Sequence, residues 1–177
     1  MKILVTGAKG FVGRNLCAEL KNRGFTDLYE YDLDTNPALL GEYAHDCEFV
    51  FHLAGVNRPE NPEDFMRGNF GFTSNLLEAL KQHHNQCPIV LSSSIQAERN
   101  NEYGNSKRAG ERLLAEYGEQ TGAKVLIYRF PNLFGKWSRP NYNGVIATFC
   151  HNISRGLPIQ INDPDAEICF AYIDDVM

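Results

Sequence analysis

Along the chain, short apolar runs alternate with longer segments in which apolar residues recur every three or four positions. The runs have the length and composition of buried strands, and the longer segments have the spacing of helices with one apolar face. The predicted strands are residues 2–6, 27–31, 48–53, 88–92, 124–130 and 168–173, and the predicted helices are residues 11–22, 64–84 and 103–117. This alternation predicts an α/β fold, a doubly wound parallel sheet with helices on both faces.

Composition and charge limit the classes of partner that the chain can bind. Its 177 residues are 43% hydrophobic and 22% charged, which is enough apolar material for a buried core. The net charge is −5 and Lys and Arg are not clustered, which argues against nucleic acid and membrane surfaces. No apolar run approaches the roughly 20 residues of a membrane span. The five cysteines are scattered without a C-x-x-C pair, so we predict reduced thiols, no metal site and a cytoplasmic location.

A spaced glycine motif follows the first predicted strand. In TGAKGFVG, Gly7, Gly10 and Gly13 stand three residues apart, where the strand ends and the first helix begins. Glycines at these places permit a tight turn, close approach of a pyrophosphate and close packing of the helix on the strand. The helix N-terminus then offers free N–H groups to the phosphates. The motif predicts a Rossmann-type dinucleotide site.

Two cues on the choice of dinucleotide conflict. Asp32 ends the second predicted strand, where a carboxylate binds the adenosine ribose hydroxyls and repels a 2′-phosphate, which favours NAD(H). Lys9 lies in the glycine loop, where a cation can pair with that phosphate and favour NADP(H). The additional negative charge of Asp34 tilts the interpretation towards NAD(H).

Tyr103 and Lys107 form a Y-x-x-x-K pair on one face of a predicted helix, and Ser94 follows the fourth strand at the ligand-binding edge of the sheet. We interpret Tyr103 as the proton donor or acceptor for a substrate oxygen during hydride transfer, with Ser94 as a hydrogen-bond donor to that oxygen. Lys107 and the oxidised nicotinamide are expected to lower the phenol pKa from about 10 towards 7.

Five motifs in one order carry a family resemblance: TGAKGFVG, FVFHLAG, the SSS strand end, YGNSK and RFPNLFG. Together they resemble the extended short-chain dehydrogenase/reductases, the NAD-dependent epimerase/dehydratase superfamily. The segments HLAGVNRPE, LSSSIQA and NLFGKWSRPNYNGVIATFC are similar to the CapF-type reductases of capsular polysaccharide synthesis. That resemblance implies NAD(P)H-dependent reduction of a 4-keto UDP-N-acetyl-dideoxyhexose.

The resemblance assigns roles by matching position. It implies a catalytic set of Ser94, Tyr103 and Lys107. The residues expected to bind cofactor are Gly7, Lys9, Gly10, Phe11, Val12, Gly13, Asp32, Leu53, Ala54, Gly55, Tyr103, Lys107, Phe130, Pro131 and Leu133. Those expected to face substrate are Ser94, Asn132, Lys136 and Arg139. Lys136 and Arg139 are candidate diphosphate anchors because the family's usual arginine before the last strand is replaced by the stretch 167–169.

The sequence also leads to predictions on the domain extent of the chain and on alternative functions. We expect residues 1–177 to form a dinucleotide-binding domain with the start of the substrate region from about residue 135, truncated before most of that C-terminal region. Some family members carry a C-terminal cupin there, and many form homodimers through two helices. An NAD-dependent nucleotide-sugar epimerase and a non-catalytic dinucleotide-sensing domain remain alternatives. His52 is predicted to be a structural histidine.

Overall fold

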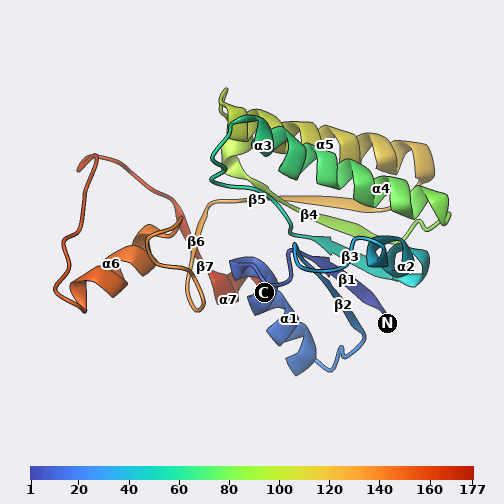
Figure 1. Cartoon of the computed structure of the whole chain (residues 1–177), viewed down its shortest axis with the longest axis horizontal. Coiled ribbons are helices and arrows are strands. Elements are labelled where there is room, and N and C mark those ends of the chain that lie inside the picture. The colour runs from blue at the N-terminus through green and yellow to red at the C-terminus, as the bar shows by residue number, and fades with distance from the viewer.

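A computed structural model describes all residues, 1–177, and its centre is a five-stranded parallel sheet (Figure 1). The strands are β1 (Ile3–Thr6), β2 (Leu28–Tyr31), β3 (Phe49–His52), β4 (Ile89–Ser94) and β5 (Val125–Phe130). They are ordered β2-β1-β3-β4-β5, and every neighbouring pair is parallel. The chain therefore winds outwards from β1 in both directions, and the predicted Rossmann-type fold class is confirmed. The chain adds strands on one side of β1 first and on the other side from β3 onwards. Folds of this kind bind ligands in the crevice at this change of winding direction, between β1 and β3.

Helices pack on both faces of the sheet. One face carries α2 (Leu39–Asp46), α4 (Phe72–Gln82) and α5 (Glu102–Thr121), which enclose the larger of two apolar clusters. The other face carries α1 (Phe11–Asn22) and the short α7 (Ile173–Val176). Side chains of β1 alternate between the two clusters: Leu4 joins the larger one, while Ile3 and Val5 join the smaller one under α1. This burial on both faces explains why the first strand is an uninterrupted apolar run.

The long helix predicted over residues 64–84 contains an irregular turn. The segment begins as α3 (Glu63–Phe65), passes through a π-helical stretch at Met66–Gly71 and continues as α4. Such insertions into a helix often mark functional sites. Here the π-helical stretch carries the buried Asn69.

The sixth predicted strand exists, but its predicted place in the main sheet is wrong. β7 (Phe170–Tyr172) pairs instead with β6 (Asn132–Phe134) in a separate two-stranded parallel sheet. Pro131 separates β5 from β6, and a proline has no N–H to donate to a ladder, so β5 ends at Phe130 and the chain leaves the sheet. The apolar run correctly predicted a strand but carried no information about its partner.

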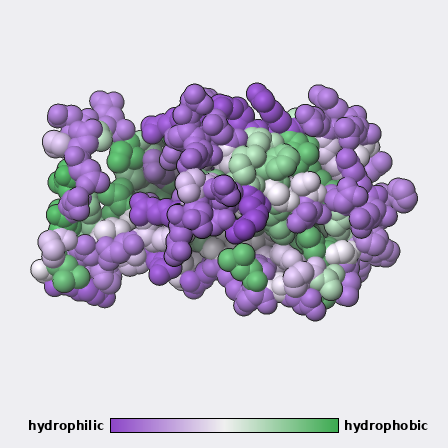
Figure 2. All heavy atoms as spheres, turned by 45° about the horizontal axis from the view of Figure 1, so that its top comes forward, coloured by the Kyte–Doolittle hydropathy of each residue, from purple (hydrophilic) through white to green (hydrophobic).

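The segment that follows β6 projects from the body of the molecule (Figure 1). Its helix α6 (Val145–Ile153) has no buried side chain although its sequence is apolar. Figure 2 shows apolar atoms exposed at this end of the molecule. The exposed large side chains of the segment that follows α6 include Leu157, Ile159, Ile161 and Ile168. None of the helices combines the length and the hydropathy that a membrane crossing requires.

Candidate active site

The glycine loop between β1 and α1 has the backbone geometry of a phosphate cradle. Gly7 has φ +69°, and a Cβ there would lie 2.7 Å from the backbone nitrogen of Ala54. A Cβ on Gly13 would lie only 2.1 Å from the carbonyl oxygen of Gly7. Helix α1 begins after Gly10, which has no capping side chain, so the N–H groups of its first turn stay available to an anion. These features fit a dinucleotide pyrophosphate.

The three charges beside this loop are arranged as one cluster. The backbone N–H of Lys9 donates to Asp32 Oδ2 at 2.7 Å, which holds the Asp32 carboxylate against the glycine loop. The Lys9 ammonium pairs with Asp34, and this contact raises the pKa of Lys9 and lowers the pKa of Asp34. The sequence offered Lys9 as a partner for the 2′-phosphate of NADP(H) and Asp32 as a partner for the ribose of NAD(H). In the structure the Lys9 cation is already paired with Asp34, which weakens the argument for NADP(H).

The segment after β3 joins the glycine loop to helix α5. A Cβ added at Gly55 would lie 3.6 Å from Lys107 Nζ and 2.8 Å from Asn69 Oδ1. The Asn69 side chain accepts from the N–H of Val56, donates to its carbonyl and donates to Ser106 Oγ at 2.9 Å. The predicted cofactor segment Leu53, Ala54 and Gly55 therefore lies between the glycine loop and Lys107.

Lys107 points towards the sheet from the second turn of α5. Its Nζ donates to the carbonyl of Ser92 at 2.7 Å, and burial lowers the pKa of this ammonium to about 8. Ser92 lies two residues before Ser94 in β4, so this contact ties the helix that carries Tyr103 and Lys107 to the strand that ends at Ser94.

The Tyr103 phenol is half-buried near Ser94 and packs against Phe65 at a ring-centroid distance of 5.6 Å. Burial raises its pKa, and the Ser94 hydroxyl offsets part of that rise. Desolvation of the phenolate is the largest cause here, and the predicted lowering of this pKa by Lys107 together with an oxidised nicotinamide stays a prediction. A raised pKa keeps the phenol protonated at neutral pH, which suits a proton donor.

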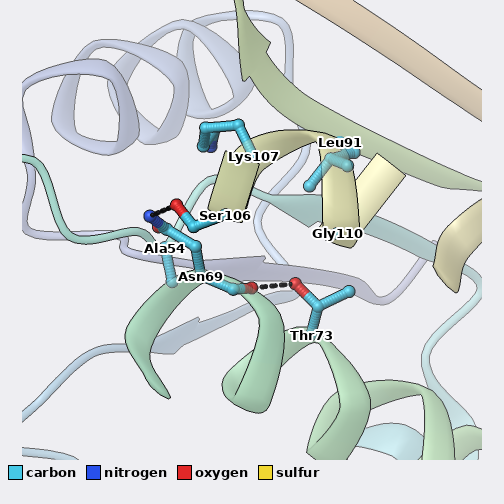
Figure 3. Close-up of a pocket in the computed structure, with 7 residues that line it drawn as sticks. All are labelled: Ala54, Asn69, Thr73, Leu91, Ser106, Lys107 and Gly110. Atoms are coloured by element: carbon cyan, nitrogen blue, oxygen red, sulfur yellow. Dashed lines mark hydrogen bonds between the residues drawn. The ribbon is translucent and has the colours of Figure 1, made fainter. Parts of the chain in front are cut away.

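A small cavity lies beside Lys107 (Figure 3). It has a volume of about 10 Å³, the space of roughly one water molecule. Its polar lining includes Asn69, Thr73, Ser106 and Lys107, contributed by the π-helical stretch, α4 and α5. A dinucleotide does not fit in it, so this cavity is not the cofactor site.

His52 is fully buried and both ring nitrogens are bonded, which supports its predicted structural role. Nε2 lies 2.8 Å from Thr73 Oγ1, and Nδ1 lies 2.7 Å from Thr6 Oγ1. Because Thr73 donates its hydroxyl proton to the Asn69 carbonyl, its oxygen must accept from His52 Nε2–H, and Nδ1 accepts from Thr6. Burial lowers the pKa of His52 to about 3, so the ring is neutral.

The predicted substrate-facing residues beyond β5 make their contacts with residues other than Ser94, Tyr103 and Lys107. Lys136 Nζ pairs with Asp174 Oδ1 at 3.0 Å, and this contact raises the pKa of Lys136. The Arg139 guanidinium lies 5.3 Å from the centre of the Tyr142 ring. Exposed Asn132 makes only a long contact, 3.5 Å, to the carbonyl of Cys169. Phe130, Pro131 and Leu133, which were predicted to bind cofactor, are partly buried around the end of β5.

Glu111 belongs to the environment of this cluster but was not predicted from the sequence. Its buried carboxylate accepts from Ser93 Oγ and from two nitrogens of Arg129. The available signal was its position one helical turn after Lys107, on the face that also carries Tyr103. Within the chain, no group of three His, Cys, Asp or Glu side chains is arranged to hold a metal ion.

The parallel sheet with a reversal between β1 and β3, the glycine cradle and the Tyr103–Lys107 helix define a nucleotide-cofactor enzyme fold. The model of the family described as NAD dependent epimerase/dehydratase matches residues 3–177. The chain belongs to this family, and the predicted resemblance is confirmed.

Individual relatives refine this result. The chain is 55% identical over all 177 residues to UDP-2-acetamido-2,6-beta-L-arabino-hexul-4-ose reductase of Pseudomonas aeruginosa, of which it covers 48%. It superposes on the capsular polysaccharide assembling protein CapF of Staphylococcus aureus with a TM-score of 0.87 and 48% identity, covering 99% of this chain and 48% of that one. A structure of MoeE5 with UDP-glucuronic acid and NAD gives a TM-score of 0.85 at 27% identity, covering 99% and 69%. The chain thus spans about half the length of the reductase and of CapF.

Proposed function

We propose that this chain is the cofactor-binding part of a nicotinamide-dependent reductase that acts on a keto sugar attached to a nucleoside diphosphate. The observation that carries the proposal is that the glycine loop, the segment after β3 and helix α5 lie together at one edge of the sheet. Lys107 lies 3.6 Å from the Cβ position of Gly55, while the backbone at Ala54 touches Gly7. A nicotinamide dinucleotide laid along the glycine loop would therefore end beside the Ser94, Tyr103 and Lys107 side chains.

The reaction adds a hydride to the carbonyl carbon of the sugar and a proton to its oxygen. A bound reduced nicotinamide would supply the hydride. Tyr103 donates the proton from its phenol, and Ser94 hydrogen-bonds the same oxygen. Lys107, held by the Ser92 carbonyl, presents its ammonium to the ribose next to the nicotinamide and to the phenolate left after proton transfer.

NAD(H) is the proposed cofactor, with a preference over NADP(H). The structural neighbour MoeE5 was solved with NAD, and the glycine cradle here fits a pyrophosphate. The preference rests on Asp32, whose carboxylate is fixed at the end of β2, and on the pairing of Lys9 with Asp34. A ribose with free hydroxyls suits that environment, and a 2′-phosphate meets two carboxylates.

For the substrate we propose a 4-keto UDP-N-acetyl-dideoxyhexose used in capsular or surface polysaccharide synthesis. The name of the Pseudomonas relative and the description of CapF support this choice. Arg139 is the proposed diphosphate contact because its guanidinium is free of carboxylate partners, whereas Lys136 is engaged by Asp174.

Substitution of the proton donor tests the function. We expect the complete natural protein to oxidise NADH when the 4-keto sugar nucleotide is added, and a Tyr103→Phe variant to lose roughly 100- to 10,000-fold in kcat. The variant should bind NADH with unchanged affinity, because the phenol oxygen is not part of the glycine cradle. Tyr128→Phe, an exposed tyrosine on β5, is the matched control and should keep full activity.

The same assay separates the rival functions. An epimerase would interconvert two sugar nucleotides with no net consumption of NADH, and a dinucleotide sensor would show no turnover and no effect of Tyr103→Phe. Either result would contradict the reductase proposal. Two predictions from the resemblance stay predictions, a homodimer formed through α4 and α5 and a C-terminal cupin in the complete protein. The cytoplasmic location predicted from the scattered cysteines stays a prediction too.

A further inference from the structure

Glu111 is a buried carboxylate in the middle of α5, only 7% exposed. Arg129 on β5 binds it with two parallel hydrogen bonds, Nε to Oε1 at 2.9 Å and Nη2 to Oε2 at 2.6 Å. Ser93 on β4 donates its hydroxyl to Oε1 as well. One carboxylate thus joins the catalytic helix to two neighbouring strands of the sheet.

Each residue of this junction is next to a residue of the proposed site. Ser93 precedes Ser94, Arg129 precedes Phe130, and Glu111 lies one helical turn after Lys107. Arg129 Nη1 also reaches Glu98 at 3.1 Å, in the 3-10 helix Ile95–Glu98 that connects Ser94 to the Tyr103 helix. A movement of Glu111 would therefore displace both sides of the site relative to each other.

Stability alone does not account for this arrangement. The Glu111 side chain is 9% exposed and Arg129 is 39% exposed, so solvent weakens the attraction of the pair while the cost of removing the carboxylate from water remains. The bidentate geometry instead fixes distance and direction at once. We propose that Glu111 is a positioning residue that holds Ser94 and Phe130 in fixed register with the helix carrying Tyr103 and Lys107. The inference rests on the proposed reductase function.

Glu111 also acts on Lys107 through its charge. The titratable groups around Lys107 are Glu111 and Tyr103 on its own helix and His52 on β3, and His52 is neutral. The negative charge of Glu111 raises the pKa of Lys107 and opposes the lowering caused by burial. Loss of that charge must lower the pKa of Lys107 further, so the ammonium would lose its proton at a lower pH.

The test compares three variants of the complete protein with wild type over a range of pH. Glu111→Gln keeps the size of the side chain and removes its charge. We expect kcat to fall at least about tenfold with sugar KM changed less than about threefold, and the alkaline limb of the kcat profile to move to lower pH. Ser93→Ala keeps the charge but removes one contact, so it should lower kcat and leave the alkaline limb in place. Glu119→Gln, exposed on the same helix, should change neither.

The outcomes separate this inference from the proposed function. No NADH-dependent reduction by wild type would overturn the reductase itself. Normal wild-type activity with an unchanged kcat in Glu111→Gln, or a loss of kcat without movement of the alkaline limb, would overturn the role of Glu111. If Glu111→Gln fails to fold by its thermal melting curve, Glu111→Asp keeps the charge on a shorter arm. It should then retain the wild-type alkaline limb with reduced kcat, and a full wild-type kcat would contradict fixed register.

Discussion

At the scale of single residues, cofactor choice depends on how one cation is held between two carboxylates. Asp32 Oδ2 accepts the backbone N–H of Lys9, while the Lys9 side chain turns to Asp34. The pair formed by Lys9 and Asp34 is about two-thirds exposed, so solvent and salt weaken it. A phosphate with two charges would compete for Lys9, but only against the repulsion of both carboxylates. We therefore predict that Asp34 is a second determinant of selectivity beside Asp32.

Substitution of Asp34 should shift this selectivity. We expect Asp34→Asn to lower the Kd for NADPH by roughly 3- to 10-fold, because Lys9 is released and one repulsive charge is lost, while the Kd for NADH changes less than about twofold. Fluorescence titration of the 177-residue chain with each dinucleotide measures both constants. Asp27→Asn, which removes a charge just before the other end of β2, is the control. An unchanged NADPH affinity in Asp34→Asn would show that Asp34 does not restrain Lys9.

At the scale of elements, the sequence predicted those whose pattern is local and missed those that depend on tertiary partners. Helix α1 has the predicted bounds because glycines flank an amphipathic run. The π-helical stretch was invisible to the pattern, since it is fixed by Asn69 bonding to Val56 and Ser106. The sequence placed Ser94 at the end of a strand and Tyr103 and Lys107 near the start of a helix, and in the structure Tyr103 lies next to Ser94. The ion pair of Lys136 with Asp174 could not be predicted from the sequence, because the two residues are 38 positions apart and no local pattern links them.

The hydrogen-bonded chain through His52 connects β1, β3 and α4 and leads to a pH prediction. The folded pKa of about 3 lies below the unfolded value near 6.5, so the unfolded state takes up a proton first as the pH falls. The contribution of His52 is complete above about pH 6.5 and is lost towards pH 3, at up to about 1.4 kcal/mol per pH unit. Urea unfolding between pH 4.5 and 7.5 should show this slope in wild type.

Two variants isolate the histidine from other acid effects. His52→Gln should be less stable at pH 7.5 and should show a flatter dependence of the unfolding free energy on pH. His83→Gln, an exposed histidine at the end of α4, should keep the wild-type slope. Equal slopes for His52→Gln and wild type would mean that His52 is charged in the folded protein or that the unfolded state does not expose it.

At the scale of the whole molecule, the chain consists of a well-packed part and a loosely packed part. The two apolar clusters draw almost all their members from residues up to 125, with Met177 the exception on the α1 side. Beyond Phe130, α6 buries no side chain, and the outward face of β5 leaves Tyr128 50% exposed. Helix α6 is held mainly by its own backbone hydrogen bonds, and an isolated helix of this length is marginal in water.

Amide hydrogen exchange should reveal this division directly. Amides of β4 (Ile89–Ser94) open only with the core, whereas amides of α6 (Val145–Ile153) can open locally without exposing buried apolar surface. We expect exchange in α6 to be at least about 100-fold faster than in β4 in the 177-residue chain, after correction for intrinsic rates. Helix α5, which is packed on the sheet through Leu114 and Tyr117, serves as the helical control and should exchange as slowly as β4. Protection of α6 within tenfold of α5 would contradict a loosely packed segment, because none of the α6 side chains is fully buried.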